Sequence, residues 1–215
     1  RLRQFHQIGV ELIGAPEPQA DVEVIAIGQH VLDALDVARE VRLELNSLGS
    51  PASRLRYREQ LVAYLERYRG DLPADSRRRL DRQPLRILDR KDEGDRRIVA
   101  AAPHLAGAYD DDSRRFFADV QDGLARLGIA FTVNPALVRG LDYYTHTAFE
   151  FTTEALGAQG AVIAGGRYDG LMGQLGGPDT PGVGWAAGIE RLALLLAETP
   201  PGPVPVAIVP IGDAA

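Results

Sequence analysis

Residues 50–128 have the spacing of helices, whereas the segments on both sides of them alternate like strands. Within this block, apolar side chains recur every three or four residues, as on one face of a helix. Before it, Arg3–Leu12 places polar and apolar side chains on alternate sides, which is the period of a strand. A helical block between two strand-rich segments favours a sheet interrupted by a helical insertion over a regular βαβ repeat.

The same patterns predict the individual elements of an α+β fold with a mostly antiparallel sheet and flanking helices. Asp21 is expected to cap a helix that runs to about Val37. We expect a last helix over Glu190–Ala197. Strands are predicted over Arg3–Leu12, Val41–Leu45, Ile129–Val133, Tyr143–Thr152, Gly160–Ala164 and Gly182–Ala187.

Composition excludes several classes of protein. The chain has 215 residues with 45% hydrophobic and 25% charged side chains, which is typical of a soluble globular protein. It contains no cysteine, so disulfides, iron–sulfur clusters and cysteine-containing zinc sites are excluded. No apolar run approaches the roughly 20 residues of a membrane helix. We therefore expect no membrane association, and the lack of cysteine fits the cytoplasm.

Both ends of the sequence indicate a fragment. Arg1 is not preceded by a methionine or a leader. A buried strand is predicted over Val204–Ile211, after the linker Pro200–Pro203, and one strand cannot bury both of its faces. We expect a further domain after it.

Positive charge is concentrated in one part of the chain. Residues 51–100 hold 14 Lys and Arg against 9 Asp and Glu, an excess of +5, whereas the remainder holds 10 against 21. Lys91 is the sole lysine, and arginine suits bidentate contacts with phosphate. A basic segment in an acidic protein indicates contact with a polyanion, although a solvated helical face has the same pattern.

The first strand carries a candidate ligand site. Gln7 and Glu11 share one side of it, roughly 13 Å apart along the strand, and Gly9 between them has no side chain. A carboxylate there can pair with an ammonium group or an imidazole N–H, and Phe5 offers a surface on which a base can stack. The alternative is a polar, solvent-facing side of an edge strand.

Three later segments combine glycine with arginine and aromatic residues: Leu137–Tyr144, Ala164–Leu171 and Gly182–Arg191. Arg139 is suited to a phosphate or carboxylate, and Arg191 is suited to stacking on a purine. The alternatives are a core role for at least one of the two neighbouring tyrosines and a surface ion pair of Arg191 with Glu190 or Glu198.

Together with Arg3–Glu11, these segments resemble the end of motif 2, the two histidine-specific motifs and motif 3 of the histidyl-tRNA synthetases, which are class II aminoacyl-tRNA synthetases. The resemblance covers about residues 1–200 in the family's order. It implies a catalytic core at 1–50 and 129–199, a helical insertion at 51–128, and a linker with the first strand of an anticodon-binding domain at 200–215.

The resemblance also implies a role for each matching residue. Gln7, Glu11, Tyr144 and Tyr168 match residues that bind histidine, with the glutamate selecting the imidazole. Arg139 matches the catalytic arginine that contacts the α-phosphate of ATP. Phe5 and Arg191 match the pair that encloses adenine, and Trp185 replaces an expected phenylalanine. The resemblance leaves the ligands of any metal ion open.

The implied activity is ATP-dependent formation of histidyl-adenylate and transfer of histidine to tRNA(His), with Mg²⁺ on the pyrophosphate. A homodimer in the cytoplasm is implied for the full-length protein. Motif 1, the Thr/Glu loop and the first half of motif 2 would precede Arg1, so the isolated chain is expected to be inactive. The alternatives are the regulatory subunit of ATP phosphoribosyltransferase, a relative that binds histidine without charging tRNA, and a helical RNA-binding protein.

Overall fold

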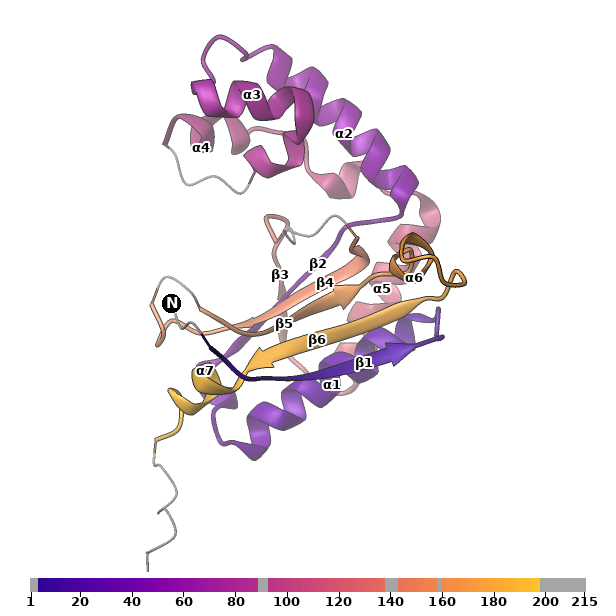
Figure 1. The fold of residues 1–215 in the computed structure, drawn as a ribbon, viewed down its shortest axis with the longest axis vertical. Coiled ribbons are helices and arrows are strands. Elements are labelled where there is room, and N and C mark those ends of the chain that lie inside the picture. The colour runs from indigo at the N-terminus through magenta and orange to yellow at the C-terminus, as the bar shows by residue number, and fades with distance from the viewer. Residues whose placement is uncertain (1–3, 89–92, 138–142, 158–159, 198–215) are drawn as a thin grey trace, which may run out of the picture.

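The computed structural model describes residues 4–88, 93–137, 143–157 and 160–197. A six-stranded sheet in the order β1-β6-β5-β4-β2-β3 forms the centre of this part (Figure 1). Strand β3 runs parallel to β2, and the other neighbouring strands are antiparallel, which confirms the predicted sheet. The strands are β1 (Gln7–Ile13), β2 (Arg42–Ser47), β3 (Phe131–Val133), β4 (Thr145–Thr152), β5 (Ala161–Arg167) and β6 (Gly182–Gly188).

The helices lie largely where the apolar spacing predicts them. They are α1 (Pro18–Ala34), α2 (Pro51–Glu66), α3 (Ala74–Arg82), α4 (Glu93–Val99), α5 (Asp111–Arg126), α6 (Leu171–Gln174) and α7 (Ile189–Ala193). Short 3₁₀ turns add η1 (Ala38–Glu40), η2 (Pro84–Ile87) and η3 (Leu105–Ala108). None of the described helices is long and apolar enough to cross a membrane.

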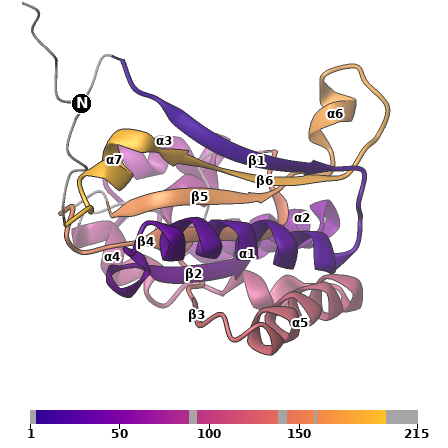
Figure 2. The same cartoon turned by 90° about the horizontal axis from the view of Figure 1, so that it is seen from below.

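One face of the sheet is covered by α1 and α5, which pack against each other (Figure 2). Ile25 and Leu32 of α1 and Leu124 of α5 are fully buried there against Phe149 of β4 and Ile163 of β5. This apolar layer fixes which side chains of each strand face away from the helices. The described helices α1 and α5 thus leave the opposite face of the sheet uncovered.

The helical insertion has a second core of its own. Leu61, Leu65, Leu80 and Ile87 are buried in it, and it extends to Tyr144 next to the sheet. Helix α5, which the predicted boundary at residue 128 assigns to the insertion, instead belongs to the core of the sheet. The packing therefore favours an insertion that ends near η3.

Two details of the fold differ from the sequence-based expectations. The predicted cap at Asp21 is wrong, because α1 begins at Pro18 after Glu17, and proline is favoured in the first turn of a helix. Asp21 is instead fully buried and forms an ion pair with Arg167. Strand β5 extends beyond the predicted Ala164 to Arg167. The strand predicted over Val204–Ile211 lies outside the described residues.

Candidate active site

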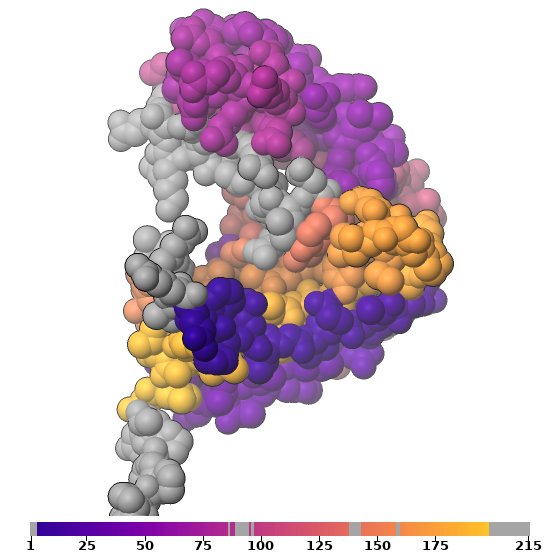
Figure 3. Space-filling model, in the orientation of Figure 1, coloured from indigo at the N-terminus to yellow at the C-terminus, as the bar shows by residue number. Residues whose placement is uncertain are grey.

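Strand β1 presents Gln7 and Glu11 on the face of the sheet opposite α1. Both residues are exposed, whereas Val10 and Leu12 on the other side pack against the core. The surface between the insertion and β1 is hollowed (Figure 3). Gly9 lies close to β6, since a Cβ there would be 2.8 Å from the carbonyl oxygen of Trp185. A side chain at position 9 would thus collide with the backbone of β6, which is a second reason for glycine there.

Glycines of β5 and β6 form the floor beneath the candidate histidine-binding side chains. Gly184 pairs with Glu11 across the strands, and a Cβ at Gly184 would overlap the Glu11 carboxylate. A Cβ at Gly182 would overlap the ring of Tyr168. At Gly166 a Cβ would lie 2.9 Å from the ring of Tyr144. The glycines therefore make room for the side chains of the candidate site.

Glu11 and Tyr168 are brought into direct contact, although 157 residues separate them in the sequence. The hydroxyl of Tyr168 donates a hydrogen bond to Oε2 of Glu11. Burial raises the pKa of the Tyr168 hydroxyl, and the hydrogen bond to Glu11 raises it further. The tyrosine therefore stays protonated and keeps the carboxylate oriented, while Glu11 itself remains exposed to a ligand.

Tyr143 links the two tyrosines that the sequence singles out. Its ring centre lies 4.7 Å from that of Tyr144 and 6.3 Å from that of Tyr168, with the second pair edge to face. Tyr144 is buried, whereas Tyr143 and Tyr168 are partly exposed. Tyr143 is an addition to the predicted site. The adjacent tyrosines signalled it, but the sequence does not say which ring faces the ligand.

The predicted adenine-binding residues lie next to a contact between the start of β1 and α7. The backbone N–H of His6 donates to the Glu190 carboxylate at 2.9 and 3.1 Å, and Nδ1 of His6 lies 2.8 Å from Oε1. The hydrogen bond to the His6 side chain lowers the pKa of Glu190. Phe5 and Arg191, which flank these two residues in the sequence, are thereby placed at the same end of the sheet.

Arg191 is partly buried, and two of its donors are unsatisfied within the described part of the chain. Its Nε and Nη2 are buried and have no hydrogen-bond partner among the described residues. Glu190 is occupied by His6, and Glu198 lies outside the described residues. Phe5 is 61% exposed, so its ring is accessible to a base. Buried donors without a partner are costly, and an acceptor on a bound ligand would satisfy them.

Two other predictions bear on the chemistry of the site. Arg139 lies outside the described residues, together with the rest of the segment 138–142. In the described part of the chain, no group of three or more His, Asp or Glu side chains is arranged to hold a metal ion. The arrangement therefore offers a carboxylate, tyrosine hydroxyls and a guanidinium as its recognition groups.

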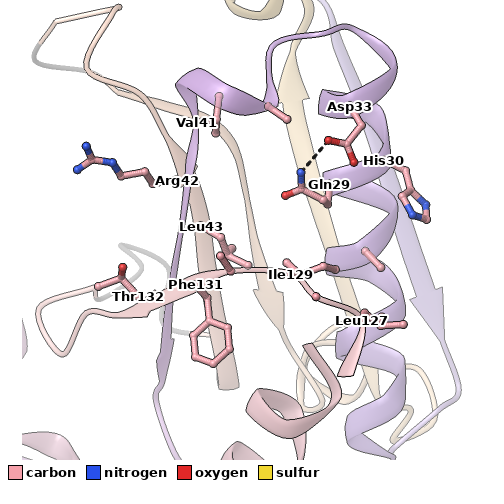
Figure 4. A pocket seen from close by; sticks show the side chains of 14 residues that line it. Gln29, His30, Asp33, Val41, Arg42, Leu43, Leu127, Ile129, Phe131 and Thr132 are labelled. Atoms are coloured by element: carbon pink, nitrogen blue, oxygen red, sulfur yellow. Dashed lines mark hydrogen bonds between the residues drawn. The ribbon is translucent and has the colours of Figure 1, made fainter. Parts of the chain in front are cut away.

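A separate pocket of about 560 Å³ lies between α1, β2 and the segment that follows α5 (Figure 4). Leu43, Ile129 and Phe131 line its apolar part. At its rim, Nε2 of Gln29 donates to Asp33 at 3.1 Å. None of the predicted site residues lines this pocket, so it is distinct from the site on the opposite face of the sheet.

Known proteins match this chain over most of its length. The model of the family "Histidyl-tRNA synthetase" matches residues 1–192. The histidine–tRNA ligase of Rhodospirillum rubrum is 61% identical over 213 residues, which are 99% of this chain and 51% of the relative. The enzyme of the same name from Gluconacetobacter diazotrophicus is 55% identical over the whole chain and 52% of its own length. The chain thus spans about half the length of these curated relatives.

Solved structures show the same fold. The apo histidyl-tRNA synthetase of S. aureus has a TM-score of 0.74 and 38% identity, and the match covers 90% of this chain and 47% of that one. A Bacillus halodurans protein titled as an ATP phosphoribosyltransferase regulatory subunit/histidyl-tRNA synthetase has a TM-score of 0.57 at 24% identity, with 90% and 54% covered, which shows the fold alone. From the family match over residues 1–192 and these likenesses, we conclude that the chain belongs to the histidyl-tRNA synthetase family.

Proposed function

We propose that this chain forms the histidine- and ATP-binding part of a histidine–tRNA ligase. The observation that carries the proposal is the contact between Tyr168 and Glu11 above the glycine floor of β6. This contact orients a carboxylate on the open face of the sheet, and we assign histidine as its ligand. The names of the relatives support the same activity.

Histidine recognition follows from the charge and shape of this group. One oxygen of Glu11 accepts from Tyr168, and the carboxylate remains exposed for an imidazole N–H. The partly exposed rings of Tyr143 and Tyr168 provide flat walls beside it. Gln7 lies on the same face of β1, four residues before Glu11. We assign it to the backbone groups of the amino acid. An amino acid whose side chain has no N–H in this position would leave the other oxygen of the Glu11 carboxylate without a donor.

ATP binding is assigned to the other end of β1. Phe5 and Arg191 enclose the adenine in this proposal, and the unsatisfied guanidinium of Arg191 gains a π-system to stack on. The His6–Glu190 contact holds the two elements together. Histidine near Glu11 and adenine near Arg191 would then lie at opposite ends of β1. The histidine carboxylate and the α-phosphate of ATP would meet between them.

The proposed reaction has two steps. The histidine carboxylate attacks the α-phosphorus of ATP, a P–O bond forms, and pyrophosphate leaves with the pair of electrons of the broken P–O bond. A ribose hydroxyl of the terminal adenosine of tRNA then attacks the adenylate carbonyl, loses its proton, and displaces AMP. Arg139 is assigned to the α-phosphate, where its two parallel N–H groups stabilise the charge that rearranges during displacement.

Mg²⁺ enters this proposal only as a companion of ATP. The described side chains do not form a metal-binding group. Magnesium commonly keeps several waters and is held through substrate phosphates. No step assigned to the residues of this chain depends on it.

The other proposed partners are tRNA(His) and a second subunit, and the proposed location is the cytoplasm. The excess of arginine in residues 51–100 supports contact between the insertion and tRNA phosphates. Part of that charge is already paired, since Arg69 bonds to Glu66 and Asp81. Homodimer formation and cytoplasmic location are proposed from the family resemblance.

Histidine-dependent exchange between ATP and pyrophosphate tests the proposal. We would place these residues in a polypeptide of the relatives' full length and compare histidine with the other amino acids. Exchange with histidine alone, followed by charging of tRNA(His), is the expected result. Histidine binding without exchange would favour the regulatory-subunit alternative. RNA binding without histidine binding would favour the alternative of a helical RNA-binding protein.

A further inference from the structure

Arg167 is the largest side chain that the described part of the chain buries completely. It ends β5 and directly precedes Tyr168. Taking a guanidinium out of water is expensive unless its donors are satisfied. Burial is the largest single effect on Arg167 and would lower its pKa, but the hydrogen bonds and negative charges of Asp21 and Asp169 together raise the pKa, so the group stays charged.

The donors of Arg167 reach two carboxylates and two backbone carbonyls. Nε donates to Asp21 of α1 at 2.9 Å, and Nη2 also bonds to this carboxylate. Nη1 donates to the carbonyl of Ala15 at 3.1 Å, and Nη2 to that of Glu17 at 3.2 Å. Nη1 also donates to Oδ1 of Asp169 at 2.9 Å. The guanidinium is therefore held from several directions at once.

These partners lie on both sides of the Tyr168–Glu11 contact. Ala15 is in the loop that follows β1, the strand that bears Glu11. Asp169 also accepts from the backbone N–H of Gly182 at 3.3 Å. The backbone N–H of Tyr168 in turn donates to the Gly182 carbonyl at 2.7 Å. Arg167 thus joins the loop after the Glu11 strand to Asp169, and Asp169 bonds to the same residue, Gly182, as the backbone of Tyr168.

We propose that Arg167 is a positioning residue for histidine recognition: through Asp21, Asp169 and the loop after β1, it sets where the Tyr168 hydroxyl meets Glu11. Apolar side chains can fill a buried volume as stably as an ion pair. Directional bonds fix geometry, and a recognition site depends on placement within a fraction of an ångström. The inference rests on the proposed function, because Glu11 must bind histidine for its placement to matter.

Asp169 offers the sharpest variant. Its side chain is 35% exposed, so its removal leaves the buried Arg167–Asp21 pair intact. We would measure dissociation constants for histidine and ATP by calorimetry in the full-length polypeptide. Asp169→Ala should weaken histidine binding about tenfold, because small misplacements are costly in such sites, and should change ATP binding less than about twofold. Asp169→Asn, which restores an acceptor, should recover most of the loss.

Two controls separate positioning from stability. Asp179→Ala removes the same group from an exposed position in the same loop and should change neither constant. If Asp169 acts through Tyr168, the variant with both Asp169→Ala and Tyr168→Phe should bind histidine no more weakly than Tyr168→Phe alone. A core variant, Arg167→Lys, keeps the charge without the fork and should raise the histidine constant in the same way if it folds.

The outcomes separate two kinds of failure. If Asp169→Ala lowers the melting temperature while histidine affinity stays unchanged, and Tyr168→Phe does weaken histidine binding, Arg167 is structural and the positioning role is wrong. If Tyr168→Phe and Glu11→Gln both leave histidine affinity unchanged, the proposed histidine site itself is wrong, and the positioning role fails with it.

Discussion

Ser50 and Asp110 cap two helices and also bind each other across 60 residues of sequence. The Ser50 hydroxyl accepts from the backbone N–H of Ser53 at the start of α2, and Asp110 accepts from that of Ser113 at the start of α5. The Ser50 hydroxyl donates to Oδ2 of Asp110 at 2.6 Å. The helical insertion therefore leaves and rejoins the core of the sheet at one hydrogen-bonded junction.

This junction should be sensitive to acid. Hydrogen bonds from Ser113 and Ser50 hold the pKa of Asp110 well below its ordinary value of 3.8. A carboxyl with a lowered pKa contributes stability that is present above the ordinary pKa and is lost as the pH falls below it. Asp110→Asn keeps a side chain that can cap α5 but replaces the charge-assisted hydrogen bonds from Ser50 and Ser113 by neutral ones, which should cost about 1 kcal/mol of local stability at neutral pH.

Amide hydrogen exchange at Ser53 and Ser113 measures this effect. Both amides should exchange faster in Asp110→Asn at neutral pH, and the variant should lack the part of the acid response that Asp110 supplies. Asp119→Asn, in an exposed position further along α5, is the matched control. Equal protection in Asp110→Asn and the unaltered protein would show that the junction contributes nothing.

Glu11→Gln should weaken histidine binding selectively. The substitution keeps the shape of the side chain and the acceptor for Tyr168 but removes the charge that faces the imidazole. Loss of one partner of a charge pair that the ligand buries costs on the order of 2 to 5 kcal/mol. Calorimetry with histidine and ATP checks this, since the ATP constant should hardly change. Unchanged histidine affinity would remove Glu11 from the site.

Gly184→Ala should have a similar effect for a steric reason. The added Cβ would overlap the Glu11 carboxylate, which must then move away from Tyr168. We expect the Michaelis constant for histidine in pyrophosphate exchange to rise about tenfold or more, with a smaller change for ATP. Gly173→Ala is the control, because the nearest atom to its Cβ is a side-chain oxygen 3.7 Å away. Equal Michaelis constants for histidine in the two variants would show that the glycine at position 184 does not constrain Glu11.

The sheet and its helical interruption could be predicted because periodicity records which side of an element is buried. Glu11 and Tyr168 were also predicted, from the strand pattern and the family resemblance. The burial of Arg167 was not, because it depends on Asp21, 146 positions away, and a charged residue after glycines has no periodic signal. The packing of α5 against the sheet could not be predicted either, because amphipathic spacing shows that one face of a helix is buried but not which element covers it.

Arg139 should act on the transition state of adenylate formation. This assignment rests on the family resemblance, since the residue lies outside the described part of the chain. Arg139→Lys keeps the charge but loses bidentate contact with the phosphate. The turnover number of pyrophosphate exchange should fall by about 10²- to 10³-fold, while the Michaelis constants change less. If turnover stayed intact and the constant for ATP alone rose, Arg139 would be a ground-state binder.

The insertion offers a test in which paired and unpaired arginines serve as matched variants. Arg77 and Arg82 of α3 are exposed and have no ion-pair partner among the described residues, whereas Arg78 on the same helix donates to Asp75 at 2.6 Å. An arginine already held by a carboxylate releases fewer counterions on binding a phosphate. We therefore expect the unpaired arginines to supply the salt-dependent part of tRNA binding.

The variant with both Arg77→Ala and Arg82→Ala should weaken binding of tRNA(His) and of other tRNAs alike, because phosphate contacts carry no sequence information. We would plot the logarithm of the binding constant against the logarithm of the salt concentration. The slope of this plot should become shallower by about one for each phosphate that the variant no longer binds. Arg78→Ala should change the slope much less. Deletion of residues 50–108 should flatten it further and impair tRNA charging more than amino-acid activation. An unaltered slope in the double variant and in the deletion would show that the basic segment is a solvated helical surface without contact to tRNA.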